Sequence, residues 1–188
     1  ANTTGTYNTA VGKNSLAANT TSSNNTAVGN NCLAANTDEE NTAIGYQAMV
    51  DNTSGGYNTA VGSDTLANNT TADHNTAVGR NALYTNTTGA HNTAIGSAAL
   101  DANTTASNNT AIGSSALGAN TTGAGNVAVG TGALSACTTG GSLVGIGLNA
   151  GNVITEGGNS IFIGDETDPS GATISNEIVI GYGSVGKG

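Results

Sequence analysis

Charge is scarce in this sequence. Three Lys or Arg residues stand against twelve Asp or Glu, and charged residues make up only 8% of the 188 positions, whereas ordinary globular domains carry about 25%. A net charge of −9 with so few basic residues leaves no positive patch for nucleic acid or for an anionic membrane surface. We therefore expect no nucleic-acid partner, and a surface made mainly of neutral polar groups.

Bulky and rigid residues are equally scarce, with one Pro, one Phe and no Trp. Apolar runs fall well short of the ~20 residues that span a bilayer, so we expect no membrane insertion. The two cysteines, Cys32 and Cys137, lie six repeats apart at different repeat positions. Coils stacked at the strand spacing of ~4.8 Å would hold them far beyond the Cα separation of about 7 Å that a disulfide bridges, which argues against an intrachain disulfide.

A repeat about seventeen residues long fills almost the whole chain. Its most regular mark is a Val or Ile followed by Gly, which occurs eleven times; nine of the ten steps are seventeen residues, and the step from Val28 to Ile44 is sixteen. The missing residue falls in the loop around Asp38-Glu39-Glu40. The eleven Val or Ile positions are Val11, Val28, Ile44, Val61, Val78, Ile95, Ile112, Val129, Ile146, Ile163 and Ile180.

Each repeat reads as one coil of a solenoid. A Thr-Ala-Val segment alternates with period two, as a short strand does, and no helical periodicity survives a Gly and several Asn in every unit. A second apolar position follows five residues later, and an Asn-Thr pair follows three further on, where Asn and Gly favour turns. The second apolar column is Leu16, Leu33, Met49, Leu66, Leu83, Leu100, Leu117 and Leu134.

The predicted fold is therefore all-β, a repetitive β-solenoid or β-roll of eleven coils. Disorder is the competing reading of a chain rich in Gly, Asn and Thr, but disordered segments lack β-branched residues at fixed positions. Residues 1–125 form the regular shaft, and residues 126–188 are more apolar coils that continue the same solenoid. In these last coils the Thr of the strand becomes Val or Ile, which suggests a tightly packed region where chains are held together.

The two faces of the strand predict how chains associate. Thr and Val share one face, which we expect to point toward the coil interior, and Ala and Gly share the other. The Ala column begins at Ala10 and Ala27 and runs to Ala128. Such small residues suit the close approach of another chain, although a plain exposed Ala face is the simpler reading. Each coil also offers only about two sizeable apolar side chains, so further burial through association is expected.

The repeat motif resembles that of known fibre proteins. Asn-Thr-Ala-Val-Gly followed by Ala-Leu and Asn-Thr-Thr-Gly, through residues 2–125, is similar to repeats of phage and prophage tail fibres and related bacterial surface proteins. The ending from Asn176 to Gly183 resembles the segment that precedes a C-terminal intramolecular chaperone domain in such fibres. Residues 126–130 and later coils resemble head repeats of trimeric autotransporter adhesins, which use a shorter repeat. The resemblance implies a homotrimeric, extracellular fibre on a virion or cell surface.

Few residues suggest chemistry. His74 and His91 occupy equivalent loop positions one coil apart, near Asp73, and fit a solvated ladder better than a small metal site. The acidic segment Asp165-Glu166-Thr167-Asp168-Pro169 lacks the alternating ligands of a calcium loop and fits an exposed loop better. Neither cysteine has a His neighbour in the repeat register. We therefore predict no catalytic residue, no metal ligand and no cofactor.

Two functions fit these features. The first is a structural shaft of a trimeric fibre that projects or forms an adhesive element for a host glycan or receptor. The second is a binding protein whose Asn and Thr ladders themselves contact carbohydrate or ice. The expected inward orientation of the strand Thr weighs against ice binding. An enzyme is not expected, because no base, nucleophile or metal set is gathered by the repeat.

Overall fold

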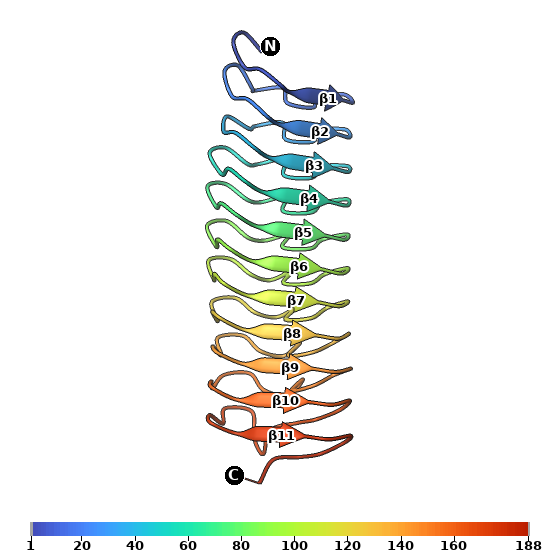
Figure 1. The fold of residues 1–188 in the computed structure, drawn as a ribbon, viewed down its shortest axis with the longest axis vertical. Helices are drawn as coiled ribbons and strands as arrows, with labels where there is room; N and C mark the ends of the chain where they lie inside the picture. Colours follow the sequence, from blue (N-terminus) through green and yellow to red (C-terminus); the bar gives the residue numbers. More distant parts are fainter. Residues whose placement is uncertain (1, 188) are drawn as a thin grey trace.

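The computed structural model describes residues 2–187 and is an all-β solenoid. Eleven three-residue strands pair in sequence order into one parallel sheet, which runs the length of the molecule (Figure 1). The fold class predicted from the repeat is thereby confirmed. The strands are β1 (Thr9–Val11), β2 (Thr26–Val28), β3 (Thr42–Ile44), β4 (Thr59–Val61), β5 (Thr76–Val78), β6 (Thr93–Ile95), β7 (Thr110–Ile112), β8 (Val127–Val129), β9 (Val144–Ile146), β10 (Ile161–Ile163) and β11 (Ile178–Ile180).

In the sheet, each strand residue pairs with the equivalent residue of the next coil. Thr59 pairs with Thr76, and Val61 pairs with Val78. The register survives the sixteen-residue step as well, because Thr26 still pairs with Thr42. Asn36 and Asn41 are five residues apart, where other coils have six, so the missing residue lies between them. The loop absorbs the deletion as predicted, and the strands stay aligned.

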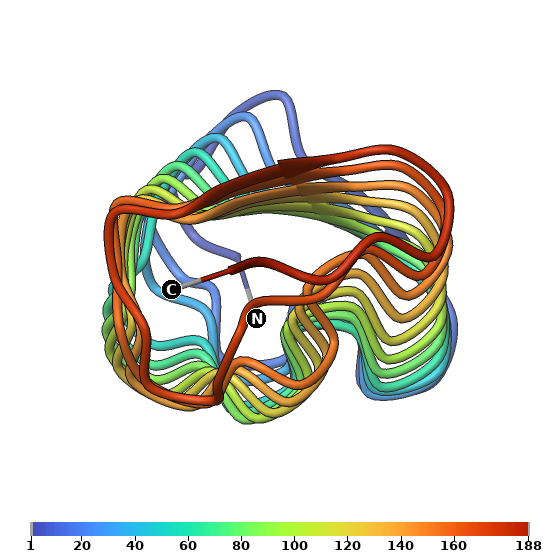
Figure 2. The same ribbon diagram turned by 90° about the horizontal axis from the view of Figure 1, so that it is seen from below.

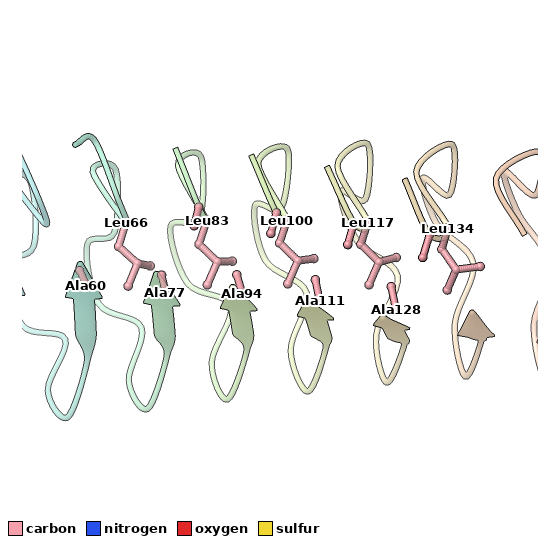
Figure 3. Close-up of a cluster of buried hydrophobic side chains, with 14 of the residues drawn as sticks. Ala60, Leu66, Ala77, Leu83, Ala94, Leu100, Ala111, Leu117, Ala128 and Leu134 are labelled. Atoms are coloured by element: carbon pink, nitrogen blue, oxygen red, sulfur yellow. The ribbon is translucent and has the colours of Figure 1, made fainter. Parts of the chain in front are cut away.

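The hydrophobic core is a pair of facing columns inside the coils. Each Leu of the second apolar column projects from one wall toward the Ala of the strands on the opposite wall (Figure 3). Leu83 and Leu100 are fully buried, and so are Ala77 and Ala94. The prediction that the Ala column approaches another chain is therefore wrong. The Leu side chains fill the narrow interior, and only Ala is small enough to face them across it.

Left-handed backbone turns each coil back on itself. The Leu column has φ between 48° and 53°, and the residue two positions earlier is also left-handed, as at Asn81 with φ 58°. Residues other than Gly adopt this backbone conformation at a cost of roughly 1–2 kcal/mol each. The pair reverses the chain around the small buried residue between them, such as Ala82. Seen end-on, the coils superpose in a closed outline with the strands along one long side (Figure 2).

The Gly after each strand is required by the stacking distance. Gly79 has φ 129°, and a Cβ placed on it would lie 2.6 Å from the carbonyl oxygen of Gly96 in the next coil. The same contact recurs from Gly12 to Gly164 because consecutive coils are equivalent. Any side chain at this position would push neighbouring coils apart.

Two ladders of buried Asn side chains join the coils from within. In the first ladder, Asn75 Oδ1 accepts from the backbone N–H of Asn92 at 2.9 Å, and Asn75 Nδ2 donates to the Gly89 carbonyl at 3.0 Å. In the second, side chains bond directly to each other, with Asn86 Nδ2 donating to Asn69 Oδ1 at 3.0 Å. The ladders satisfy backbone groups that turning would otherwise leave buried without partners.

The interior changes in the last coils. Leu143 takes the place of the first Asn ladder, whose last member is Asn126. Phe162 replaces the small strand residue and is fully buried, and Gly151 replaces the Leu that would otherwise occupy this space. A Cβ on Gly151 would lie only 2.7 Å from Cδ2 of Phe162. The large and small residues have exchanged walls, so the core remains filled.

Candidate functional site

The strongest candidate for a functional surface is the outward face of the sheet, hereafter the outer sheet face. It consists of the first and third residue of every strand, and we call the two residues of one strand a rung. Ile44 is 41% exposed, Ile95 39% and Val11 57%. The expected inward orientation of Thr and Val is therefore wrong, because the alternating strand directs Ala inward and both β-branched neighbours outward.

The outer sheet face carries no charged residue over its eleven rungs, although the chain as a whole has a net charge of −9. All of its side chains are Thr, Val or Ile. At the ~4.8 Å spacing of strands the face extends for roughly 50 Å. A contiguous surface of this kind is unusual on a protein that stays alone in water.

The face has two chemically different parts. In β1 to β7 every rung pairs a Thr with a Val or Ile, and in β8 to β11 both residues are Val or Ile. The last rung is the most exposed, with Ile178 at 68% and Ile180 at 65%. Within residues 2–187 the Thr hydroxyls of this face make no hydrogen bond to protein groups, and so they are available to water or a ligand.

Other Thr side chains are already engaged along one corner of the solenoid. Thr70 Oγ1 donates to the carbonyl of Thr87 at 3.1 Å, and Thr87 Oγ1 donates to that of Thr104 at 3.0 Å. Both Asn ladders are buried, with Asn75 and Asn86 at most 1% exposed. The prediction that Asn ladders form a binding surface is therefore wrong. In the described part of the chain, the Thr of the outer sheet face form a regular ladder whose side chains remain free.

His74 and His91 form part of an exposed stack of aromatic rings, as the ladder interpretation predicts. Their ring centroids lie 5.0 Å apart, and the ring of Tyr57 lies 4.9 Å from that of His74. Asp73 is engaged elsewhere, since its Oδ1 accepts from the backbone N–H of Gly56 at 2.8 Å. In the described part of the chain no group of three or more His, Cys, Asp or Glu is placed to hold a metal ion.

The two cysteines are buried and free, and no bridge joins them, in agreement with the sequence argument. Burial raises the pKa of the Cys32 thiol to about 11 and that of the Cys137 thiol to about 11. Cys32 Sγ also lies 3.1 Å from the carbonyl oxygen of Ala43, to which it donates. Thiols in such surroundings are inert structural residues rather than nucleophiles.

The acidic segment near the C-terminus is only partly exposed. Glu166 is exposed, but Thr167 and Pro169 are buried, so the interpretation of the segment as an exposed loop is wrong for its second half. Asp168 stands where earlier coils have Leu, and its half-buried carboxyl has a raised pKa, mainly because burial disfavours the charged form. Its backbone pairs with Val185 in an isolated parallel bridge.

Comparisons with protein-family models, with curated proteins and with solved structures found no match. Over residues 2–187 the structure has no helix of the length and hydrophobicity needed to cross a bilayer. The chemistry of the outer sheet face is therefore the main indication of function.

Proposed function

We propose that this chain is the structural shaft of a homotrimeric fibre on a virion or cell surface. Three copies pack their outer sheet faces around a common axis, and the shaft projects or forms an adhesive element that contacts a host glycan or receptor. The observation that carries the proposal is the uncharged, β-branched face, which is exposed or half-exposed along all eleven rungs. The role is mechanical and requires no catalysis, cofactor or metal.

The sheet geometry supports association through this face. All-parallel sheets are almost always covered on both faces. Here the inner face is covered by the Leu column, and the outer face is open in the single chain. A second and third copy present the same uncharged surface, so no charge has to be buried when the faces meet.

A parallel arrangement of the copies fits the composition of the face better than an antiparallel one. When all chains point the same way, the Val and Ile rungs of β8 to β11 meet each other. In an antiparallel pair the last rung, Ile178 and Ile180, would meet the first rung, Thr9 and Val11. A common axis along the solenoid therefore buries more apolar surface at the C-terminal end.

The stiffness that a shaft requires comes from the hydrogen bonds between coils. Strand pairing, the two Asn ladders and the Thr corner ladder all join residues about one repeat apart. Lys and Arg number only three in the chain, which leaves few sites for proteases that cut after basic residues. Both features suit a fibre exposed outside a cell.

The test is the mass of the particle in solution, measured by sedimentation equilibrium. We expect a trimer for the natural chain and a monomer for the double variant Val78→Glu, Ile95→Glu, because burying these charges at the interface is costly. The matched control Thr71→Glu, Thr88→Glu changes two exposed residues away from the sheet and should remain trimeric. A natural chain that is monomeric at all concentrations would refute the proposal.

Ice or carbohydrate binding is the second candidate, favoured by one observation. The Thr hydroxyls of β1 to β7 face outward in a regular array, which removes the objection that they point inward. This function requires the face to be free of other copies. Thermal hysteresis or glycan-array binding by a monomeric natural chain would support it and would contradict the shaft.

A further inference from the structure

We propose that the four C-terminal rungs, β8 to β11, set the axial register in which the copies associate. This inference rests on the proposed function, because it concerns how the outer sheet faces of several copies are aligned. The rungs change from Thr-containing to fully aliphatic between β7 and β8. We call the rungs of β8 to β11 the aliphatic rungs.

A repetitive face has a register problem. From β1 to β7 every rung presents Thr followed by Val or Ile. If one copy slides along another by one coil, Thr still meets Thr and a β-branched aliphatic residue still meets another. Register is weakly specified wherever the pattern of a face repeats without a distinguishing mark. The regular shaft therefore cannot select the aligned arrangement by itself.

The aliphatic rungs supply the missing mark. A slip of one coil places Thr110 of one copy against Val127 of the next, and leaves the last rung of one copy without an aliphatic partner. That last rung contains Ile178 and Ile180, the most exposed aliphatic residues of the face. Buried hydroxyls without partners and exposed Ile both disfavour the slipped arrangement.

The interior of the same coils is distinct as well. The first Asn ladder ends at Asn126, which bonds to the backbone N–H of Leu143 rather than to another Asn. The second ends at Asn120, and Cys137 follows it in the column. Phe162 fills the core behind the rung of β10. Both Asn ladders therefore run through the coils of the Thr rungs and end at the start of the aliphatic rungs, because no Asn occupies either column behind β9 to β11.

The experiment reports register directly through disulfides. Two sets of full-length chains carry one new cysteine each on the outer sheet face, Thr26→Cys or Thr42→Cys, and are refolded together and oxidised. Aligned copies join like positions, 26 to 26 and 42 to 42, while a one-coil slip joins 26 to 42. Mass spectrometry measures the ratio of mixed to like disulfides, and the buried Cys32 and Cys137 stay outside the reaction.

The test variant makes the face uniform by replacing four aliphatic residues: Val127→Thr, Val144→Thr, Ile161→Thr and Ile178→Thr. Like disulfides should fall about threefold and mixed ones should rise, because the aligned arrangement and the two one-coil slips then have similar free energies. The matched control applies the same two Val and two Ile changes within the regular shaft, at Val61, Val78, Ile95 and Ile112. It should keep the natural ratio.

The outcomes separate this inference from the proposed function. A trimer with mainly like disulfides in the natural chain and control, and mixed disulfides in the test variant, supports the inference. A trimer whose disulfides stay like-to-like in the test variant overturns the register assignment and leaves the shaft intact. Equal scrambling in control and test variant also overturns it, because register then depends on the whole face. A monomeric natural chain overturns both.

Discussion

Removing one amide from the first Asn ladder should lower the free energy of unfolding by more than a substitution on the surface of the solenoid does. Asn75→Ala leaves the buried backbone N–H of Asn92 without a partner, and it removes one of two amide donors to the Gly89 carbonyl, which still accepts from Asn86. One unsatisfied buried group costs roughly 1–3 kcal/mol, so the free energy of unfolding should fall by about that amount. Urea denaturation followed by circular dichroism measures the change.

Asn75→Asp adds a dependence on pH with a definite sign. The carboxyl still accepts from Asn92, but it no longer donates to Gly89 unless it is protonated. Burial and the facing carbonyl oxygen raise the pKa of this Asp in the folded state above its unfolded value of about 3.9. The penalty is therefore absent below about pH 3.9, grows as the pH rises and levels off above the folded pKa.

The control is Asn68→Ala, which removes a half-buried Asn side chain that belongs to neither ladder. It should lower the free energy of unfolding by less than about 1 kcal/mol, as surface substitutions usually do. If Asn75→Ala and Asn68→Ala have equal effects, the buried ladder contributes nothing specific. If Asn75→Asp loses the same free energy of unfolding at pH 3 and pH 7, residue 75 does not lie in the buried, carbonyl-facing position described.

Three further substitutions and one chemical reaction test the packing. Gly79→Ala should disrupt coil stacking because its Cβ would meet the Gly96 carbonyl. Asn81→Gly should instead relieve left-handed backbone strain and stabilise the folded protein by up to about 1 kcal/mol. Thermal melting curves of the two variants measure these opposite effects. Phe162→Ala should cost about 3–5 kcal/mol through the cavity it leaves, measured by urea denaturation, and an unchanged midpoint would contradict the packing described. Cys32 and Cys137 should resist iodoacetamide at pH 8.5 in the native protein and react within minutes in urea. The reason is that burial holds both thiol pKa values at about 11 in the folded state. Mass spectrometry measures the labelling, and rapid labelling of the native protein would contradict this expectation.

The repeat in the sequence predicts the eleven coils, their register and the position of the deletion. It does not predict which strand face lies inside. Period-two alternation separates Ala77 from Thr76 and Val78, but size alone favours the larger Val for the core. The outcome is decided by the opposite wall, where left-handed backbone directs Leu83 into the same narrow space.

The local sequence pattern also does not predict that the Asn side chains are buried and form ladders. Asn at a loop position reads as a turn residue, and turn residues are usually exposed. One signal was nevertheless present: two Asn positions are invariant from coil to coil up to Asn120 and Asn126, while neighbouring loop positions vary, as at His74 beside Asn75. A turn tolerates exchange among several residues, whereas a ladder that both donates and accepts at every step requires the same amide each time.

Because every coil bonds only to the coils directly above and below it, the length of this molecule is free to change by whole units. An in-frame duplication or loss of one repeat within the gene inserts or removes a coil and leaves every remaining junction chemically unchanged. A gene built of near-identical repeats is prone to such copying slips. Variation in reach among related sequences is therefore an expected product of this architecture, obtained without any new packing solution.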